Sequence, residues 1–307
     1  MASGMIRLGV IVAYARAKYG EEPTLEQYAE FLNWVSLMGF DGFELAAFSR
    51  DHFHSQFRDK LRLNDIRQKY QSLGLECNAF EAGFLRSMMV DSSRDVRRQL
   101  VEDFENVVET AGAIDAPLVY GHPAIHPSWK VEWRRLYDEF SPPISVVVPT
   151  KFSWKRAWED YVELVGELTD LAGEAGLRFA LEIRPFAMVT TSDSMIRLAE
   201  AVGSNNLGAV FDTGHLFVQK EILPVAIEKL GDKVFLVHLA DNDGLTDYHW
   251  APGRGKIHWE SVIQTIEKTD YRGYANMDVA GGDEDIESET KLGLEYIRKI
   301  LSQTSDL

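Results

Sequence analysis

Four stretches in the C-terminal half of the sequence decide the fold: RFALEI (178–183), GAVFDTGH (208–215), VFLVHLA (234–240) and YANMDV (274–279). Each is a short, nearly continuous apolar run, the pattern typical of a parallel strand that is buried on both faces. Each also carries a carboxylate or an imidazole near its end. The four stretches therefore predict parallel strands whose C-terminal ends bear polar groups.

Four similar runs precede them, at 6–13, 42–47, 75–81 and 117–122. The segments between the runs place apolar residues three and four apart, which predicts helices at 24–38, 64–73, 92–110, 153–172, 192–202, 219–230, 258–268 and 287–301. Thr24, with Gln27 three positions later, forms a capping-box pattern. Eight strands alternating with eight helices predict a single (β/α)8 TIM barrel of the α/β class over residues 1–307. The alternative, a doubly wound open sheet, is disfavoured because no Gly-x-Gly-x-x-Gly follows the first strand.

Composition narrows the classes of function. Apolar residues make up 45% of the chain and charged residues 26%, as in a folded enzyme. The formal charge of −16 disfavours a nucleic-acid partner. The single cysteine, Cys77, rules out an internal disulfide and a multi-thiolate metal site. Because the sequence has neither a membrane-spanning run nor a signal-peptide pattern, we expect a cytoplasmic enzyme without a membrane partner. Monomer and homo-oligomer both stay open.

One segment interrupts the regular alternation of strands and helices. Residues 123–150 contain five prolines together with Trp129 and Trp133, and Trp154 and Trp158 follow directly. A long loop after the fourth strand of a barrel opens onto the catalytic face. We expect a Pro/Trp-rich insertion that acts as a lid, with an indole such as Trp129 covering a sugar ring. The alternative is that these tryptophans only pack the insertion on itself.

The polar strand ends predict a metal site. In a barrel, side chains at the C-terminal ends of the strands point into one shared site. Converging carboxylates repel one another, so a cation is the simplest explanation for a cluster of them. The expected ligands are Glu182, Asp212, His238 and Asp278. Three carboxylates and one imidazole favour Mn²⁺, with Mg²⁺, Co²⁺ and Zn²⁺ as alternatives. A network of salt bridges using Arg184 and Arg254 is the competing explanation.

Three further strand residues are candidates for the same site. His122 ends the fourth predicted strand, and an imidazole that titrates near neutral pH can act as a general base. The alternative is an ordinary loop histidine. Glu44 and Glu81 lie on the second and third predicted strands, where they could bind substrate hydroxyls.

With these motifs the chain resembles the sugar phosphate isomerase/epimerase superfamily, whose fold is a xylose isomerase-like barrel. The resemblance rests on Glu182, on Asp212-Thr-Gly-His215, on His238-Leu-Ala-Asp241 and on the segment from Asp247 to Ile257. It implies metal ligation by the four expected ligands and action on a small carbohydrate. It also implies that His215 binds a substrate hydroxyl or carbonyl. We expect further substrate contacts from Arg184, His249 and Arg254.

Two positions depart from the family pattern. Family epimerases carry a glutamate where this chain has Asp278, and an arginine where it has Gly244. The resemblance implies a metal-dependent sugar isomerase or epimerase that works through an enediolate, with Glu182 and Asp278 as candidate bases. The departures keep open a lyase of the same fold, such as an inosose-type dehydratase or an enzyme that cleaves 3-keto- or C-glycosides. A remote alternative is an abasic-site endonuclease, whose additional metal ligands match the spacing of His215, Asp247 and His249.

Overall fold

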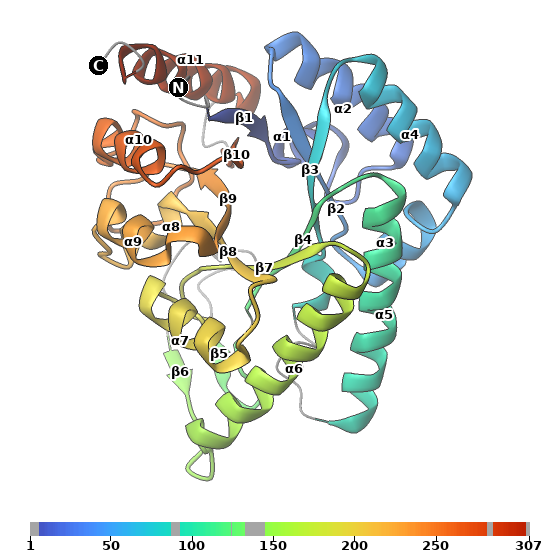
Figure 1. Cartoon of the computed structure of the whole chain (residues 1–307), viewed down its shortest axis with the longest axis vertical. Coiled ribbons are helices and arrows are strands. Elements are labelled where there is room, and N and C mark those ends of the chain that lie inside the picture. Colours follow the sequence, from blue (N-terminus) through green and yellow to red (C-terminus); the bar gives the residue numbers. More distant parts are fainter. Residues whose placement is uncertain (1–5, 87–92, 124, 133–144, 281–284, 305–307) are drawn as a thin grey trace.

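Eight parallel strands close into a barrel with helices around it, as the computed structural model of the chain shows (Figure 1). The structure describes residues 6–86, 93–123, 125–132, 145–280 and 285–304. Around the barrel the strand order is β1-β10-β9-β8-β7-β4-β3-β2. The strands are β1 (Arg7–Val10), β2 (Gly42–Ala46), β3 (Glu76–Glu81), β4 (Leu118–Gly121), β7 (Arg178–Glu182), β8 (Leu207–Asp212), β9 (Val234–Leu239) and β10 (Tyr274–Met277). The predicted (β/α)8 TIM barrel is confirmed.

Long helices cover the outside of the barrel. They are α2 (Leu25–Met38), α4 (Lys60–Ser72), α5 (Arg94–Ala113), α6 (Trp154–Glu174), α7 (Ser192–Val202), α9 (Leu223–Leu230), α10 (Trp259–Lys268) and α11 (Ile286–Thr304). They correspond to the eight predicted helices. The capping box is confirmed, because the Thr24 side chain accepts from the backbone N–H of Gln27 and the Gln27 side chain accepts from that of Thr24.

Short elements were missed by the sequence prediction. They are α1 (Ala13–Tyr19), α3 (Arg50–Gln56), α8 (Thr213–Val218) and the 3₁₀ turns η1 (Gly83–Leu85) and η2 (Gly231–Lys233). Elements of three to seven residues are too short to show a periodic apolar pattern. The predicted strand at 208–215 was therefore too long. Strand β8 ends at Asp212, and α8 begins at the next residue.

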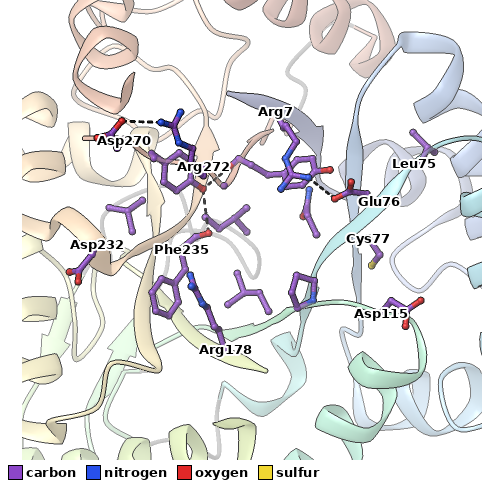
Figure 2. Close-up of a pocket in the computed structure, with 18 of the residues that line it drawn as sticks. Arg7, Leu75, Glu76, Cys77, Asp115, Arg178, Asp232, Phe235, Asp270 and Arg272 are labelled. Carbon is purple, nitrogen blue, oxygen red and sulfur yellow. Dashed lines mark hydrogen bonds and ion pairs between the residues drawn. The ribbon is translucent and has the colours of Figure 1, made fainter. Parts of the chain in front are cut away.

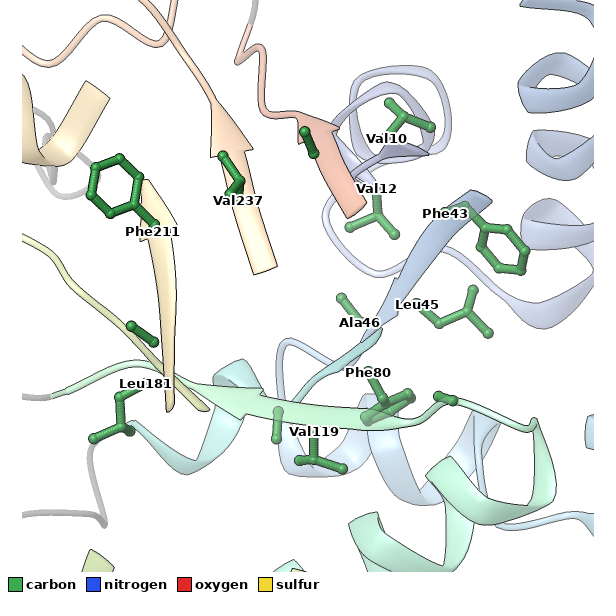
Figure 3. Close-up of a cluster of buried hydrophobic side chains, with 14 of the residues drawn as sticks. Val10, Val12, Phe43, Leu45, Ala46, Phe80, Val119, Leu181, Phe211 and Val237 are labelled. Carbon is green, nitrogen blue, oxygen red and sulfur yellow. The ribbon is translucent and has the colours of Figure 1, made fainter. Parts of the chain in front are cut away.

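Alternation along the strands divides the buried side chains into two clusters. One lies between the strands and the helices and includes Phe43, Leu181 and Phe211 (Figure 3). The other fills the barrel interior and consists of Ala79, Leu118, Tyr120, Ala180, Val210, Leu236 and Tyr274. On three of these strands, the residue two positions further along is polar: Glu182 follows Ala180, Asp212 follows Val210, and His238 follows Leu236. The interior is therefore apolar in its middle and polar toward the C-terminal ends of the strands, called the barrel mouth below.

A cavity of about 820 Å³ opens at the opposite end, among the N-terminal ends of the strands, called the barrel base below (Figure 2). Its charged side chains are held at the rim: Arg7 pairs with Glu76 at 2.6 Å and lies over the ring of Tyr274. Both members of this pair are well exposed, with 44% and 63% of their side chains accessible. None of the residues that line the cavity belongs to the predicted site, so the two are separate.

The predicted insertion is described in part. Strands β5 (Lys130–Glu132) and β6 (Ser145–Val147) form a two-stranded antiparallel ribbon within it. Trp133 lies outside the described residues. Among the described helices, none is long and apolar enough to cross a membrane.

Candidate metal centre and active site

The four expected metal ligands meet at the barrel mouth. Strand register brings them together, because Asp212 of β8 lies beside His238 of β9, and Glu182 ends the neighbouring strand β7. Asp278 follows directly on β10. One candidate ligand atom from each of the four side chains lies within 4.8 Å of the others. All four residues are buried.

His238 is at the centre of this cluster. Its Nδ1 lies 3.0 Å from Glu182 Oε1, 3.4 Å from Asp278 Oδ2 and 3.9 Å from Asp212 Oδ2. Its other ring nitrogen, Nε2, donates to Glu44 Oε1 at 2.9 Å. A carboxylate behind one nitrogen of a metal-binding histidine keeps the hydrogen there and leaves the other nitrogen free to ligate.

Asp212 has two oxygens in different situations. Oδ1 caps α8 by accepting from the backbone N–H of His215 at 2.6 Å. Oδ2 is buried and has no hydrogen-bond partner among the described residues. Burial raises the pKa of Asp212 to about 6. A buried carboxylate oxygen without a partner is costly, and a divalent cation would satisfy it together with the three neighbouring donors. The residues present therefore fit a divalent metal ion.

The two arginines of the competing salt-bridge explanation lie in different parts of the barrel mouth. Arg184 Nη1 lies 3.4 Å from Glu182 Oε2 and 3.0 Å from His122 Nδ1, so it does reach the edge of the site. Arg254 forms its ion pair with Glu289 of α11 at 2.7 Å and lies over the ring of Trp250. This pairing connects the 250–255 turn to α11. Substrate binding by Arg254 stays a prediction.

A second group of potential ligands adjoins the first. Asp247 contacts both His215 Nδ1, by a short hydrogen bond, and His249 Nε2, at 3.4 Å. His249 Nδ1 also lies 3.3 Å from Asp278 Oδ1. Burial opposes a charged ring at His215, yet Asp212 and Asp247 raise its pKa to about 9. His215 and His249, both expected at the site, thus belong to one buried network with the four ligands.

His122 links the site to strand β3. Its Nε2 lies 3.3 Å from Glu81 Oε1 and 3.4 Å from Glu182 Oε2. Burial, followed by the charges of Glu182 and Glu44, raises the pKa of Glu81 to about 8. His122, Glu81 and Arg184 therefore form one side of the cluster, next to the carboxylate expected to act as a base.

Two of the residues expected to contact substrate, Glu44 and Trp129, lie outside the cluster of four expected ligands. Glu44 is 1% exposed inside the barrel, and its oxygens accept from His238 and Tyr120, so it lies behind the expected metal ligands. Trp129 packs within the insertion, with ring centroids 5.4 Å from Phe152 and 6.4 Å from His126. These contacts correspond to the packing alternative for Trp129.

Sequence reasoning gave Asp241 no role beyond its place in a motif. Besides the N–H of the next residue, its buried carboxylate accepts from the backbone N–H groups of Gly253 (3.0 Å) and Ile257 (3.2 Å) in the following loop. It also accepts from the indole of Trp259, the first residue of α10, at 2.8 Å. Asp241 therefore holds the loop that carries Asp247. The signal in the sequence was an acidic residue directly after an apolar strand, which does not by itself separate a ligand from a loop anchor.

Comparison with known proteins identifies the family. Residues 32–300 match the family model described as the xylose isomerase-like TIM barrel. The D-psicose 3-epimerase of Ruminiclostridium cellulolyticum is 21% identical over 263 residues, which is 85% of this chain and 80% of that protein. The inosose isomerase of Halalkalibacterium halodurans is 23% identical over 279 residues, covering 85% and 86%.

A solved structure supports the same fold. D-psicose 3-epimerase with D-tagatose, from Clostridium cellulolyticum H10, matches with a TM-score of 0.75 at 18% identity, over 96% of this chain and 99% of that one. The family model spans every strand of the barrel except β1, and so includes all four strands that carry the cluster at the mouth. The chain belongs to the xylose isomerase-like TIM barrel family.

Proposed function

We propose that this protein is a divalent-metal-dependent isomerase or epimerase of a keto-sugar or a related polyol. The observation that carries the proposal is the cluster of Glu182, Asp212, His238 and Asp278, in which Asp212 Oδ2 is buried without a partner among the described residues. Relatives named for D-psicose epimerisation and for inosose isomerisation support the substrate class. Mn²⁺ is the proposed ion, because carboxylates with one imidazole suit it.

The four ligands would hold the ion, which when bound polarises a carbonyl and an adjacent hydroxyl and so acidifies the proton on carbon. Glu182 is the proposed base that removes this proton. Burial opposes its ionisation, but His122, His215 and His238 outweigh burial and hold its pKa well below the usual range. Glu182 is therefore ionised, which is the form that a base requires. Loss of the proton leaves the substrate as an enediolate, and the proton returns on another carbon or on the opposite face.

Neighbouring side chains would orient the substrate. His215 Nε2 lies 3.7 Å from Glu182 Oε2, and Arg184 Nη1 lies 3.4 Å from the same oxygen. Both can donate hydrogen bonds to hydroxyl or carbonyl oxygens placed beside the base. His122, which lies between Glu81 and Glu182, is the proposed partner in moving the proton. His249 completes the rim through Asp278.

A lyase of the same fold is the second candidate, and the contacts of Asp278 favour it. Asp278 is one methylene shorter than the glutamate of family epimerases, and its two oxygens lie 3.3 Å from His249 Nδ1 and 3.4 Å from His238 Nδ1. A carboxylate engaged on both oxygens suits ligation better than proton transfer. One base would then start the reaction, and a β-substituent would leave from the enediolate.

One experiment separates the candidates. The Mn²⁺-loaded protein is incubated in D₂O with a panel of ketohexoses, inososes and 3-keto-glycosides, and products are identified by NMR. An isomerase or epimerase gives a stereoisomer or positional isomer that carries deuterium on carbon. A lyase gives a product that has lost water or an aglycone. Product that forms with no deuterium in either substrate or product would refute the shared proton-abstraction step.

A nucleic-acid substrate is disfavoured by charge. The chain carries 32 Lys and Arg against 48 Asp and Glu, and an acidic protein repels a phosphate backbone. We therefore propose a small carbohydrate as substrate rather than an abasic site in DNA. Nicking of an abasic duplex by the metal-loaded protein would reverse this assignment.

A further inference from the structure

A column of buried polar side chains crosses the barrel interior behind the candidate metal centre. His238 Nε2 donates to Glu44 Oε1 at 2.9 Å, and Asn276 Nδ2 donates to the same oxygen. Asn276 and Asn78 exchange two amide hydrogen bonds of 3.0 Å each. Tyr120 donates to the other oxygen, Glu44 Oε2, at 2.6 Å. Every member of the column is buried.

We propose that Glu44 is a positioning residue for His238: it fixes the orientation of the ring and keeps a hydrogen on Nε2. The inference rests on the proposed function, in which His238 is a metal ligand. The ring has two nitrogens, and the one that ligates is decided by the hydrogen bond that the other one makes. With Glu44 behind Nε2, it is Nδ1 that faces Glu182 and Asp278.

The surroundings of Glu44 leave it no role at the surface of the site. It is 1% exposed, and both of its oxygens accept hydrogen bonds from neighbouring side chains, so burial keeps it from a substrate at the mouth. Tyr120 and Asn276 hold the carboxylate from either side, which restrains its rotation. A carboxylate that cannot turn also restrains the imidazole bonded to it.

The first strand is shaped to leave room for this column. A Cβ atom on Gly9 would overlap the side chain of Asn276 and lie 2.7 Å from Asn78 Nδ2. Glycine is therefore required at this point of β1, because the amide pair occupies the space that any other side chain would take. The pair in turn holds the Asn276 amide against Glu44.

The test compares Glu44→Ala and Glu44→Gln with the wild-type protein. Mn²⁺ affinity is measured by titrating metal-free protein with Mn²⁺ and following free Mn²⁺ by electron paramagnetic resonance. Glu44→Ala should weaken Mn²⁺ binding by roughly 10- to 100-fold, the range for loss of a partner behind a metal-ligating histidine. Glu44→Gln should lose less, because its amide oxygen can still accept from His238.

The matched control is Asp103→Asn. Asp103 is a fully buried carboxylate on α5 that accepts from Arg50 Nε, away from the barrel interior. This variant should unfold at a lower temperature and bind Mn²⁺ as the wild type does. A loss of Mn²⁺ affinity in Asp103→Asn equal to that in Glu44→Ala would mean that destabilisation alone explains the effect, and would overturn the proposal.

A second readout starts from the wild-type protein, so its outcome does not depend only on how a variant folds. In ¹⁵N-histidine-labelled wild-type protein, with Zn²⁺ and without metal, NMR should show a His238 Nε2–H proton that exchanges slowly with water. Glu44→Ala should lose this signal, and His238→Gln serves to assign it. Absence of the signal in the wild type would overturn the proposal. So would a Glu44→Ala protein that keeps the signal and binds Mn²⁺ within twofold of wild type. A wild type that binds no Mn²⁺ yet shows the protected proton would refute the metal site and leave the Glu44–His238 pairing supported.

Discussion

The two ends of the barrel use the same kinds of side chain in opposite ways. At the base, Arg7 and Glu76 form an ion pair at 2.6 Å with 44% and 63% of their side chains exposed. At the mouth, His238 and Glu182 approach to 3.0 Å with 2% and 5% exposed. Solvent screens the first pair, whereas the second lies among further carboxylates that water does not reach.

Ion pairs that stabilise the fold and charges that gather at the candidate site differ in how each charge is balanced. The described pairs at the base join one cation to one anion, as Arg7 and Glu76 do and as Arg272 and Asp270 do at 3.0 Å. The mouth instead gathers acids around His238 and leaves Asp212 Oδ2 without a partner among the described residues. An excess of buried anions is a cost that folding alone does not require.

Asp212→Asn should have the largest effect on Mn²⁺ affinity and turnover. The amide oxygen can still cap α8 through the backbone N–H of His215, so the variant removes the charge and keeps the cap. We expect Mn²⁺ affinity to fall by at least about 100-fold and turnover to fall with it, because an anionic ligand is lost. Glu76→Gln at the base is the control and should change neither quantity. Mn²⁺ affinity is measured by calorimetry. Equal losses of affinity in the two variants would show that the mouth and the base do not differ in metal binding.

Asp278→Glu should have the next largest effect if Asp278 transfers a proton. Lengthening the side chain moves the carboxylate by roughly 1 Å, and misplacement on this scale costs on the order of 100-fold in rate. If Asp278 is only a ligand, kcat should mostly survive while metal affinity changes modestly. Steady-state kinetics on an accepted substrate distinguish the two results. The first supports a two-base isomerase and the second a one-base lyase.

Glu81→Gln should change how stability depends on pH in the metal-free protein. The pKa of Glu81 is raised from 4.5 to about 8, by burial first and then by Glu182 and Glu44. Between these values the folded state holds a proton that the unfolded chain has released. This group therefore lowers the free energy of unfolding by about 1.4 kcal/mol per pH unit as pH rises, and its effect levels off above pH 8.

Urea unfolding of the wild type and of Glu81→Gln at several pH values between 5 and 8 measures this slope. Between pH 5 and 8 the free energy of unfolding should fall less steeply with pH in Glu81→Gln than in the wild type. Glu76→Gln, at the exposed barrel base, should show the same pH dependence of unfolding as the wild type. Parallel curves for Glu81→Gln and the wild type would show that Glu81 titrates normally.

The smallest effect is expected for Trp129→Ala, which tests whether the insertion is a lid. The ring contacts described for Trp129 are with His126 and Phe152. A lid that covers substrate predicts a several-fold rise in KM with little change in Tm. Packing of the insertion on itself predicts unchanged kinetics and a lower Tm, and Phe152→Ala should then behave in the same way.

The sequence predicted the barrel and the cluster because both depend on short-range patterns. Apolar runs locate the strands, and the C-terminal ends of parallel strands necessarily meet, so Glu182, Asp212 and His238 could be grouped without a structure. The sequence did not predict that Asp212 also caps α8, because a six-residue helix has no periodic apolar pattern.

Depth along the barrel axis could not be predicted. The pairing of β2 with β3 shifts register between Phe43 and Glu44, so counting residues along a strand does not reveal that Glu44 lies behind His238. The ion pair of Arg254 could not be predicted for a related reason. Its partner Glu289 lies on α11, and only the packing of that helix brings the two together.

Metal binding at the barrel mouth is tested most directly by anomalous diffraction from crystals of the metal-free protein soaked in Mn²⁺. We expect a Mn²⁺ peak at the mouth, within coordinating distance of Glu182, Asp212, His238 Nδ1 and Asp278. We expect the peak to be lost from Asp212→Asn crystals soaked in the same way. A wild-type crystal with no peak at the mouth under saturating Mn²⁺, or with peaks only beside exposed carboxylates such as Glu76, would contradict the proposed metal site.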